Sequence, residues 1–418
     1  MNKPAGANVV LKSRAYLTLL ACRTCALFAF AFAPVALSFG VLGMPGGSAS
    51  VLSLILFFQM APQVVLQLFG GVIADRYPRA LLIGTAEFIV GTSWGLLGWQ
   101  LSLDRPSVPM MCVFAALIGV GGSLVYPALT GIIPDLVDEE YLTEANSYLQ
   151  GANALARLIG VVAGGTAVAL LGGPLALFCA TALFWGSSAL AFTLPKIQPT
   201  GNKQASMVEQ LKEGWVEFSS RQWLWVVVVA YAFVTFFFQG IVGVLGPVLA
   251  NDFYGGATGW TFVLAGEAIG AIVAVVVGMY WRPKHPLYVG SVLAMLAGLP
   301  GIGLSFVMPI SLVFVLALGL GFGMEIFSIY WMTAMQLEVP AESLSKVASY
   351  DAFGSLIFAP LGLIVAGMAA DIFGATISTL VASLATILVM ALSLLSPVLR
   401  SLSPYKGREQ VSAQAEVA

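Results

Sequence analysis

The sequence is poor in charge, histidine and cysteine, and each shortage argues against a class of function. Of the 418 residues, 9% are charged and 59% are hydrophobic, and the mean hydropathy is +0.94. A soluble domain is about 25% charged, so this chain has too little polar surface to face water on all sides. Its net charge of −2 argues against a nucleic-acid partner. The single His285 argues against a metal site or a catalytic set built on histidine.

The four cysteines lie in apolar runs, where a thiol behaves as a small hydrophobic group. Cys22 and Cys25 form a C-x-x-C, but inside a membrane span this spacing favours packing over redox or metal chemistry. No G-K-[ST] motif for binding ATP phosphates is present. We therefore expect no disulfide framework, no cofactor and no metal.

Long apolar runs fill most of the chain. They exceed the ~20 residues that a helix needs to cross a bilayer, and the ten-residue alternation of a membrane β-barrel is not found. The sequence predicts an all-α integral membrane protein with twelve spans. The spans are predicted at 15–41, 48–71, 80–101, 108–133, 144–171, 174–195, 223–250, 257–281, 286–307, 310–334, 346–370 and 374–397.

Lysine and arginine are distributed unequally between the two sets of loops. With the N-terminus in the cytoplasm, fifteen basic residues lie inside and only Arg105 lies outside, which predicts that both termini are cytoplasmic. The fifteen are Lys3, Lys12, Arg14, Arg76, Arg79, Lys196, Lys203, Lys212, Arg221, Arg282, Lys284, Lys346, Arg400, Lys406 and Arg408. We expect a multi-pass protein of the cell (inner, cytoplasmic) membrane.

A polar segment and an internal repeat divide the chain. Residues 137–148 (VDEEYLTEANSY) align with 339–350 (VPAESLSKVASY), and Gly160, Gly165 and Gly172 match glycines 202 residues later. A parallel repeat of this kind is typical of transporters with two pseudo-symmetric six-helix halves. The predicted domains are a half at 1–195, a linker at 196–222 with an amphipathic helix, a half at 223–397 and a cytoplasmic tail at 398–418.

The stretch GGVIADRYPR (70–79) places charges between spans 2 and 3. Gly71, Asp75, Arg76 and Arg79 resemble the signature loop of the major facilitator superfamily, with Pro78 and Ala80 departing from its pattern. A gate is predicted, in which the Asp75 carboxylate accepts hydrogen bonds from the start of span 11. Arg76 and Arg79 would pair with acidic residues. The alternative is positive-inside anchoring and a tight turn.

Those acidic candidates are Asp135, Asp138 and Asp351.

Gly160, Gly164 and Gly165 in span 5 resemble the glycine-rich antiporter motif of the same family. Val161 replaces its proline. Small residues let helices approach closely, and span 8 is the predicted partner through Gly266 and Gly270. The alternative is generic small-residue packing. The arginine motif that is common in span 4 of proton-coupled drug exporters is missing.

Ionisable residues inside spans are functional hypotheses by default. Glu267 in span 8 and Glu325 in span 10 are the proton-coupling candidates, because burial disfavours the charged form of a carboxyl group. Arg157 in span 5 would pair with Glu267, either as a proton-sensitive switch or as a static ion pair. Arg23 would hold an anionic substrate group or pair with Glu325. Glu87 would pack on a peripheral helix or reach toward the inner surface.

Span 7 is rich in aromatic residues, and two aromatic residues follow Glu325 in span 10. Tyr231, Gln239, Tyr330 and Trp331 are candidates for a cavity that takes an amphiphilic ligand. Each is also compatible with a core or lipid-facing position.

The whole chain resembles the major facilitator superfamily. The motifs WRP (281–283) and IPDLV (133–137) resemble its branch that contains the enterobactin exporter and macrolide-efflux proteins. The resemblance implies the fold of that family and export of an amphiphilic small molecule such as a drug, macrolide or siderophore. It also implies proton antiport and alternating access. We expect the substrate, the proton and the lipid bilayer as partners, and a monomer.

The alternatives to an exporter are an inward symporter, a lipid carrier, a receptor without transport, and a membrane enzyme. The last would need a clustered catalytic set that the single histidine does not supply.

Overall fold

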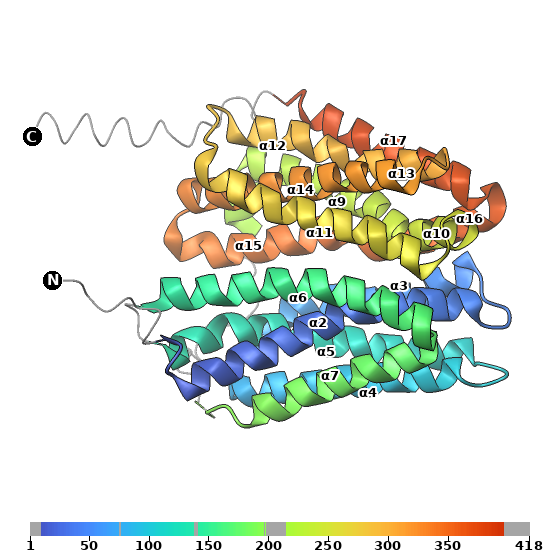
Figure 1. The fold of residues 1–418 in the computed structure, drawn as a ribbon. Helices are drawn as coiled ribbons and strands as arrows, with labels where there is room; N and C mark the ends of the chain where they lie inside the picture. Colours follow the sequence, from blue (N-terminus) through green and yellow to red (C-terminus); the bar gives the residue numbers. More distant parts are fainter. Residues whose placement is uncertain (1–9, 75–76, 138–140, 196, 198–214, 397–418) are drawn as a thin grey trace, which may run out of the picture. The chain divides into compact units, whose positions relative to one another are not determined.

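The computed structural model describes residues 10–74, 77–137, 141–195, 197 and 215–396. All regular elements in these ranges are helices (Figure 1). Twelve spans in the described part are long and apolar enough to cross a membrane. They coincide with the twelve predicted spans and confirm the all-α membrane class.

The first six spans are single helices. They are α2 (Arg14–Gly43), α3 (Ala49–Ala74), α4 (Arg79–Leu101), α5 (Val108–Leu136), α6 (Leu142–Leu171) and α7 (Gly173–Phe192).

Three of the last six spans are interrupted. The elements are α9 (Gln222–Gly240), η2 (Ile241–Leu245), α10 (Gly246–Phe253), α11 (Ala257–Tyr280), α12 (Pro286–Ala294), η3 (Met295–Gly298), α13 (Leu299–Ser305), α14 (Ile310–Glu338), α15 (Ala341–Leu356), α16 (Ala359–Phe373) and α17 (Ala375–Ser393).

Prolines explain these three interruptions. A proline ring clashes with the carbonyl four residues earlier and removes one helical hydrogen bond. Four residues before Pro247 lies the π-helical turn η2, and four before Pro300 lies the 3₁₀ turn η3. Four residues before Pro360, α15 ends. The sequence predicted these spans but not their breaks.

The chain gathers into two compact units. Unit 1 comprises Met1–Gln204, Val242–Ala265 and Leu363–Ala375, and unit 2 comprises Ala205–Ile241, Gly266–Gly362 and Thr376–Ala418. Unit 1 contains the first predicted half together with segments of the second. Unit 2 contains most of the second predicted half together with the end of the predicted linker. The predicted domain boundaries at 195 and 223 therefore stay a prediction.

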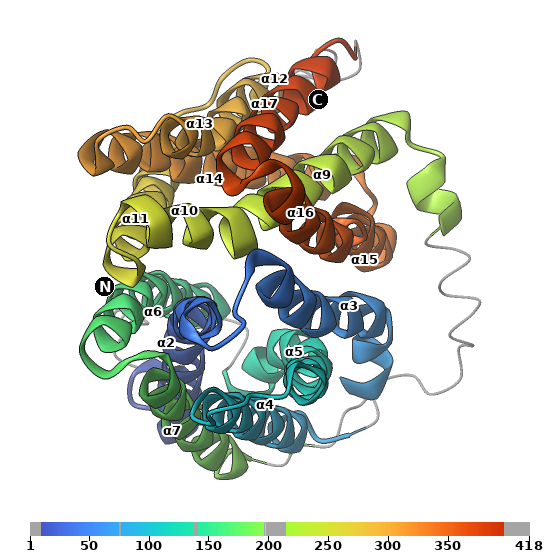
Figure 2. The ribbon, with the colours of Figure 1, turned by 90° about the vertical axis from the view of Figure 1, so that its right-hand side faces the viewer.

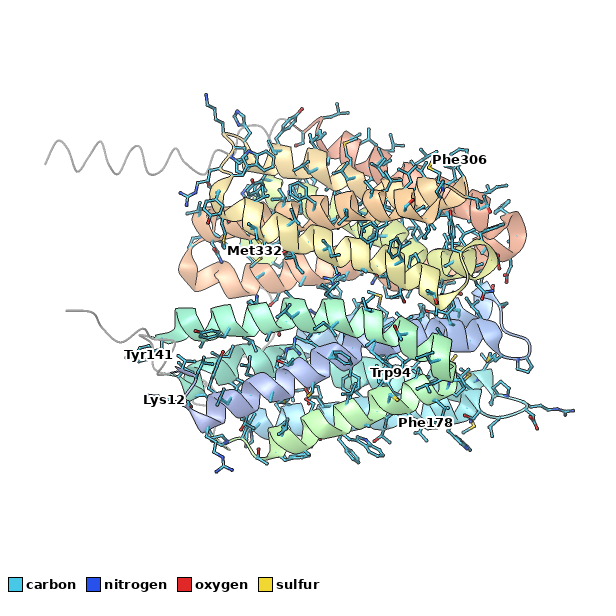
Figure 3. All side chains as sticks on the ribbon, viewed as in Figure 1. Lys12, Trp94, Tyr141, Phe178, Phe306 and Met332 are labelled. Atoms are coloured by element: carbon cyan, nitrogen blue, oxygen red, sulfur yellow. The ribbon has the colours of Figure 1, made fainter. Side chains whose placement is uncertain are left out.

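In unit 1, α2 packs against α6 and α7, α4 packs against α5 and α7, and α3 packs against α5, as the view along the helices shows (Figure 2). Trp94 is only 1% accessible in the centre of this bundle, whereas Phe178 on α7 is accessible on its surface (Figure 3). Exposed apolar side chains such as that of Phe178 are expected on helices whose outer surface faces lipid.

In unit 2, α9 packs against α15, and α12 and α13 pack against α14. The end of the predicted linker belongs to this unit. Trp215 and Phe218 place their rings 5.7 and 5.9 Å from the ring of Tyr350 on α15. Both residues belong to the predicted linker, whose amphipathic helix is predicted to place Val208, Leu211, Trp215 and Phe218 on one face. Val208 and Leu211 lie outside the described residues.

Arg221 ties the same segment to α14. Its guanidinium pairs with Glu217 and donates a hydrogen bond to the Glu338 carbonyl at 2.7 Å. Glu338 is the last residue of α14, where free carbonyls and the helix dipole favour a cation.

The internal repeat has the same local structure in both copies. Gly172 and Gly374, matched in sequence, have φ angles of 81° and 83°. Their amides donate to Val168 at 2.9 Å and Ala370 at 3.0 Å, which are again 202 residues apart. A positive φ favours glycine, so the same residue ends spans 5 and 11 for the same reason.

Candidate functional site

The signature loop lies at the junction of α3 and α4. Gly71 is in the last turns of α3, and Arg79 is the first residue of α4. Asp75 and Arg76 lie outside the described residues, as does Asp138. The predicted gate contacts therefore stay predictions.

Two of the three motif glycines in α6 pack against a helix other than the predicted one. A Cβ atom on Gly160 would lie 2.6 Å from the Phe28 carbonyl oxygen, and one on Gly164 would lie 2.8 Å from that of Phe32. Both phenylalanines are on α2, which is span 1. The predicted partner, span 8, is wrong for these two glycines, because this side of α6 is turned toward α2.

Gly266 on α11 also has a different partner. A Cβ atom there would lie 2.8 Å from the Phe314 carbonyl oxygen of α14. A Cβ atom on Gly270 would clash with the backbone of Leu318 on α14. The predicted role of both glycines in packing span 8 against span 5 is therefore wrong, and they pack span 8 against span 10.

Gly165 does meet span 8. A Cβ atom on Gly165 would clash with the side chain of Thr261 on α11, and one on Gly367 would clash with Ser53 on α3. Gly165 and Gly367 are matched by the repeat, so spans 5 and 8 and spans 11 and 2 meet through equivalent contacts of a glycine with a hydroxyl residue. All four residues belong to unit 1.

The five predicted charges within spans lie on five helices. Arg23 on α2 is half-buried and Arg157 on α6 is exposed, both in unit 1. Glu267 on α11 and Glu325 on α14 are half-buried in unit 2. A Cβ atom on Gly321 would clash with the backbone of Glu267, so α11 and α14 are in close contact there.

The predicted pairs of Arg157 with Glu267 and of Arg23 with Glu325 each combine residues of two different units, and they stay predictions.

Glu87 is the most deeply buried carboxyl group among the described residues, at 1% accessible. Its Oε2 atom lies 3.8 Å from the Cys22 Sγ atom, and Cys22 lies 3.2 Å from the Ser187 Oγ atom. The Oε1 atom has no hydrogen-bond partner among the described atoms. Glu87 therefore packs between α2, α4 and α7, and the snorkelling alternative does not fit.

Of the four predicted cavity residues, two are buried on α14 and two are half-buried on α9. Tyr330 is buried, and its hydroxyl donates to the Trp281 carbonyl at 3.0 Å, which ties α14 to the end of α11. Tyr231 and Gln239 are half-buried on α9. Trp331 is buried, and its Nε1 atom donates to the Asp351 Oδ2 atom at 3.1 Å.

Sequence reasoning treated Asp351 only as a gate partner. In the structure it accepts hydrogen bonds from Trp331 and, at 3.4 Å, from Ser355. Its position five residues inside predicted span 11 is the signal that identifies it, since an ionisable residue within an apolar run is a functional hypothesis by default.

Known proteins with similar sequences or structures are transporters. The sequence profile of the Major Facilitator Superfamily matches residues 16–359. Macrolide efflux protein A of Streptococcus pyogenes is 23% identical over 343 residues, covering 78% of this chain and 82% of that protein.

The lysophospholipid transporter LplT of Photorhabdus laumondii is 31% identical over 185 residues, 41% of each chain. A crystal structure of a mutant form of the nucleoside transporter NupG matches with a TM-score of 0.78 at 10% identity and covers 91% of this chain and 99% of that one. This structural likeness concerns the fold alone. Together with the twelve spans, the profile match over most of the chain shows that the protein is a transporter that belongs to the Major Facilitator Superfamily.

Proposed function

We propose that this transporter exports an amphiphilic small molecule, such as a drug, macrolide or siderophore, by proton antiport with alternating access. The observation that carries the proposal is a pair of half-buried carboxyl groups, Glu267 and Glu325, on two membrane helices that pack against each other. Such groups are costly in a membrane and are typical of proton pathways. The similarity to a macrolide efflux protein supports the outward direction.

The glycine contacts support alternating access. Gly165 with Thr261 and Gly367 with Ser53 bring helices close without long side chains between them. Such contacts separate without breaking ion pairs, so a few kcal/mol of differential binding can shift the equilibrium between states. Asp75, Arg76 and Arg79 would form the gate on the cytoplasmic side.

The excess of basic residues in one set of loops supports an inner-membrane location with both termini in the cytoplasm. The two six-helix halves at 1–195 and 223–397 would be the moving bodies. We propose that the protein acts as a monomer.

A lipid carrier is the second candidate function. The similarity to the lysophospholipid transporter LplT, over 185 residues, favours it. Two measurements distinguish the lipid carrier from the exporter: the direction of transport, and whether lysophospholipid triggers proton movement.

Substrate-triggered proton movement in inside-out vesicles tests the proposal. Lipophilic cations, macrolides, siderophores and lysophospholipids are added to wild type, Glu267→Gln and Glu325→Gln. Asp371→Asn is the matched control, because Asp371 is an exposed carboxyl group on α16. We expect proton movement in wild type and in the control, and its loss in at least one glutamine variant.

A signal that survives in both glutamine variants would contradict the assignment of the proton carriers. Proton movement with lysophospholipid alone would favour the lipid carrier. No proton movement with any compound, in folded protein, would contradict proton-coupled export of these classes.

A further inference from the structure

We propose that unit 2 contains a binding site for an organic cation, so that the exported molecule carries a basic or quaternary amine. This inference rests on the proposed function and narrows its substrate class. The site consists of three stacked aromatic rings, the Asp351 carboxyl group that accepts a hydrogen bond from one of them, and the Glu325 carboxyl group on α14, the helix that carries two of the rings. Its residues are Tyr231, Glu325, Phe327, Trp331 and Asp351.

Asp351 supplies an oriented negative charge. Trp331 donates to Oδ2 at 3.1 Å, and Ser355 donates to Oδ1 at 3.4 Å. Both donors are neutral, so they orient the carboxylate without cancelling its charge. No basic side chain in the described part of the chain pairs with it, and Asp351 is half-buried.

The three aromatic rings are packed and fixed. The ring of Tyr231 stacks on Phe327 with centroids 4.6 Å apart, and Phe327 stacks on Trp331 at 6.3 Å. Phe327 and Trp331 are 3% and 6% accessible, whereas Tyr231 is half-buried. A cation within about 6 Å of a ring centroid is attracted by the π-electrons, and Tyr231 is the least buried of the three aromatic residues.

Two acidic residues act on the same phenol. Asp351 from α15 and Glu325 from α14 both interact electrostatically with Tyr231 on α9. The Tyr231 hydroxyl contacts the Met324 sulfur atom at 3.6 Å. Negative charge from two helices attracts a cation and repels an anion, and the flexible thioether accommodates ligands of different shape.

These features separate the candidate substrates. A cationic amphiphile gains from the carboxylates and from the aromatic rings, whereas an anionic siderophore is repelled by the same carboxylates. A neutral ligand gains only from the apolar surface.

Three probes of similar size and different charge test the site: tetraphenylphosphonium, neutral triphenylphosphine oxide and anionic tetraphenylborate. Binding to the purified full-length transporter is measured by equilibrium dialysis. We expect the cation to bind more tightly than the other two. Asp351→Asn and Glu325→Gln should each weaken cation binding about tenfold or more, as expected for the loss of one close charge partner. Asp371→Asn should bind as wild type does.

Asp351→Glu keeps the charge and should retain more of the cation affinity than Asp351→Asn. If Asp351→Asn does not fold, the cation affinities of Asp351→Glu and Glu325→Gln test the site instead. Equal binding of the cation and the neutral probe would overturn the proposal, and so would unchanged cation binding in Asp351→Asn and Glu325→Gln.

Vesicle transport separates this inference from the proposed function. Export of a neutral amphiphile with no export of any cation would overturn the cation site and leave proton-coupled export in place. Cation binding without any proton-coupled export would support the site and contradict the proposed mechanism.

Discussion

Glu87 places a carboxyl group where neither water nor lipid reaches it. One oxygen lies near the Cys22 thiol, and the other has no hydrogen-bond partner among the described atoms. Arg23, one residue after Cys22, is close enough to interact with it electrostatically. A buried carboxyl group is costly when it is incompletely bonded, but its removal is also costly when it pairs with a cation. A substitution of Glu87 by an apolar residue therefore raises stability if the carboxyl group is incompletely bonded, and lowers it if the group is paired with a cation.

We predict that Glu87→Met stabilises the folded protein by about 1–3 kcal/mol, because it removes an incompletely bonded polar group. The thermal unfolding midpoint of the purified protein measures this change. Asp371→Asn, an exposed acidic residue, should leave the midpoint unchanged. A lower midpoint for Glu87→Met would mean that Glu87 is ionised and paired with Arg23.

At the scale of the helices, glycines decide how closely two spans approach. Gly160 meets the Phe28 carbonyl of span 1, and its repeat partner Gly362 meets the Phe236 carbonyl of span 7. Both spans are the first of their predicted half. The repeat therefore preserves a helix contact as well as a sequence pattern.

We predict that Gly362→Ala destabilises the protein by about 1–3 kcal/mol, because a Cβ atom would clash with the backbone of Phe236, which cannot move cheaply. The unfolding midpoint of the purified protein measures this effect. Gly186→Ala on α7 is the matched control, since a Cβ atom there has no neighbour within 4 Å. It should stabilise by roughly 0.5–1 kcal/mol through helix propensity. If both variants behave alike, close packing at Gly362 is contradicted.

The same contacts matter at the scale of the whole molecule. Gly165 with Thr261 and Gly367 with Ser53 are related by the repeat, and each joins a helix of one predicted half to a helix of the other. An alternating-access cycle would have to make and break both. A side chain placed in either contact should therefore change the population of the conformation that contains it.

We predict that Gly367→Val exposes position 53. Ser53 is 2% accessible, so a Ser53→Cys thiol should react slowly with a membrane-impermeant maleimide in an otherwise wild-type protein. In the Gly367→Val background the reaction should be faster, because the valine prevents the close approach of α16 and α3. Gly186→Val, on a surface of α7 without close neighbours, should leave the rate unchanged. A protected thiol in the Gly367→Val protein would contradict this role of the contact.

The membrane class, the number of spans and the repeat can all be predicted from the amino-acid sequence. Hydropathy is summed along the chain, so an apolar run long enough to cross a bilayer is visible without knowledge of its neighbours. The match of Gly172 and Gly374 predicted equivalent positions, and both have the same positive φ. Proline chemistry is equally local, yet Pro34 and Pro62 lie inside uninterrupted helices whereas Pro247 follows a π-helical turn.

Which helices contact one another could not be predicted from the sequence and is known from the packing of the folded chain. The sequence predicts close packing at Gly160 and Gly164, but their partner is α2 and not α11. Asp351 bonds to Trp331, 20 residues earlier on another helix, and Glu87 packs beside Cys22 and Ser187. The rotation of each helix about its axis depends on packing against all its neighbours. No local pattern in the chain records that rotation.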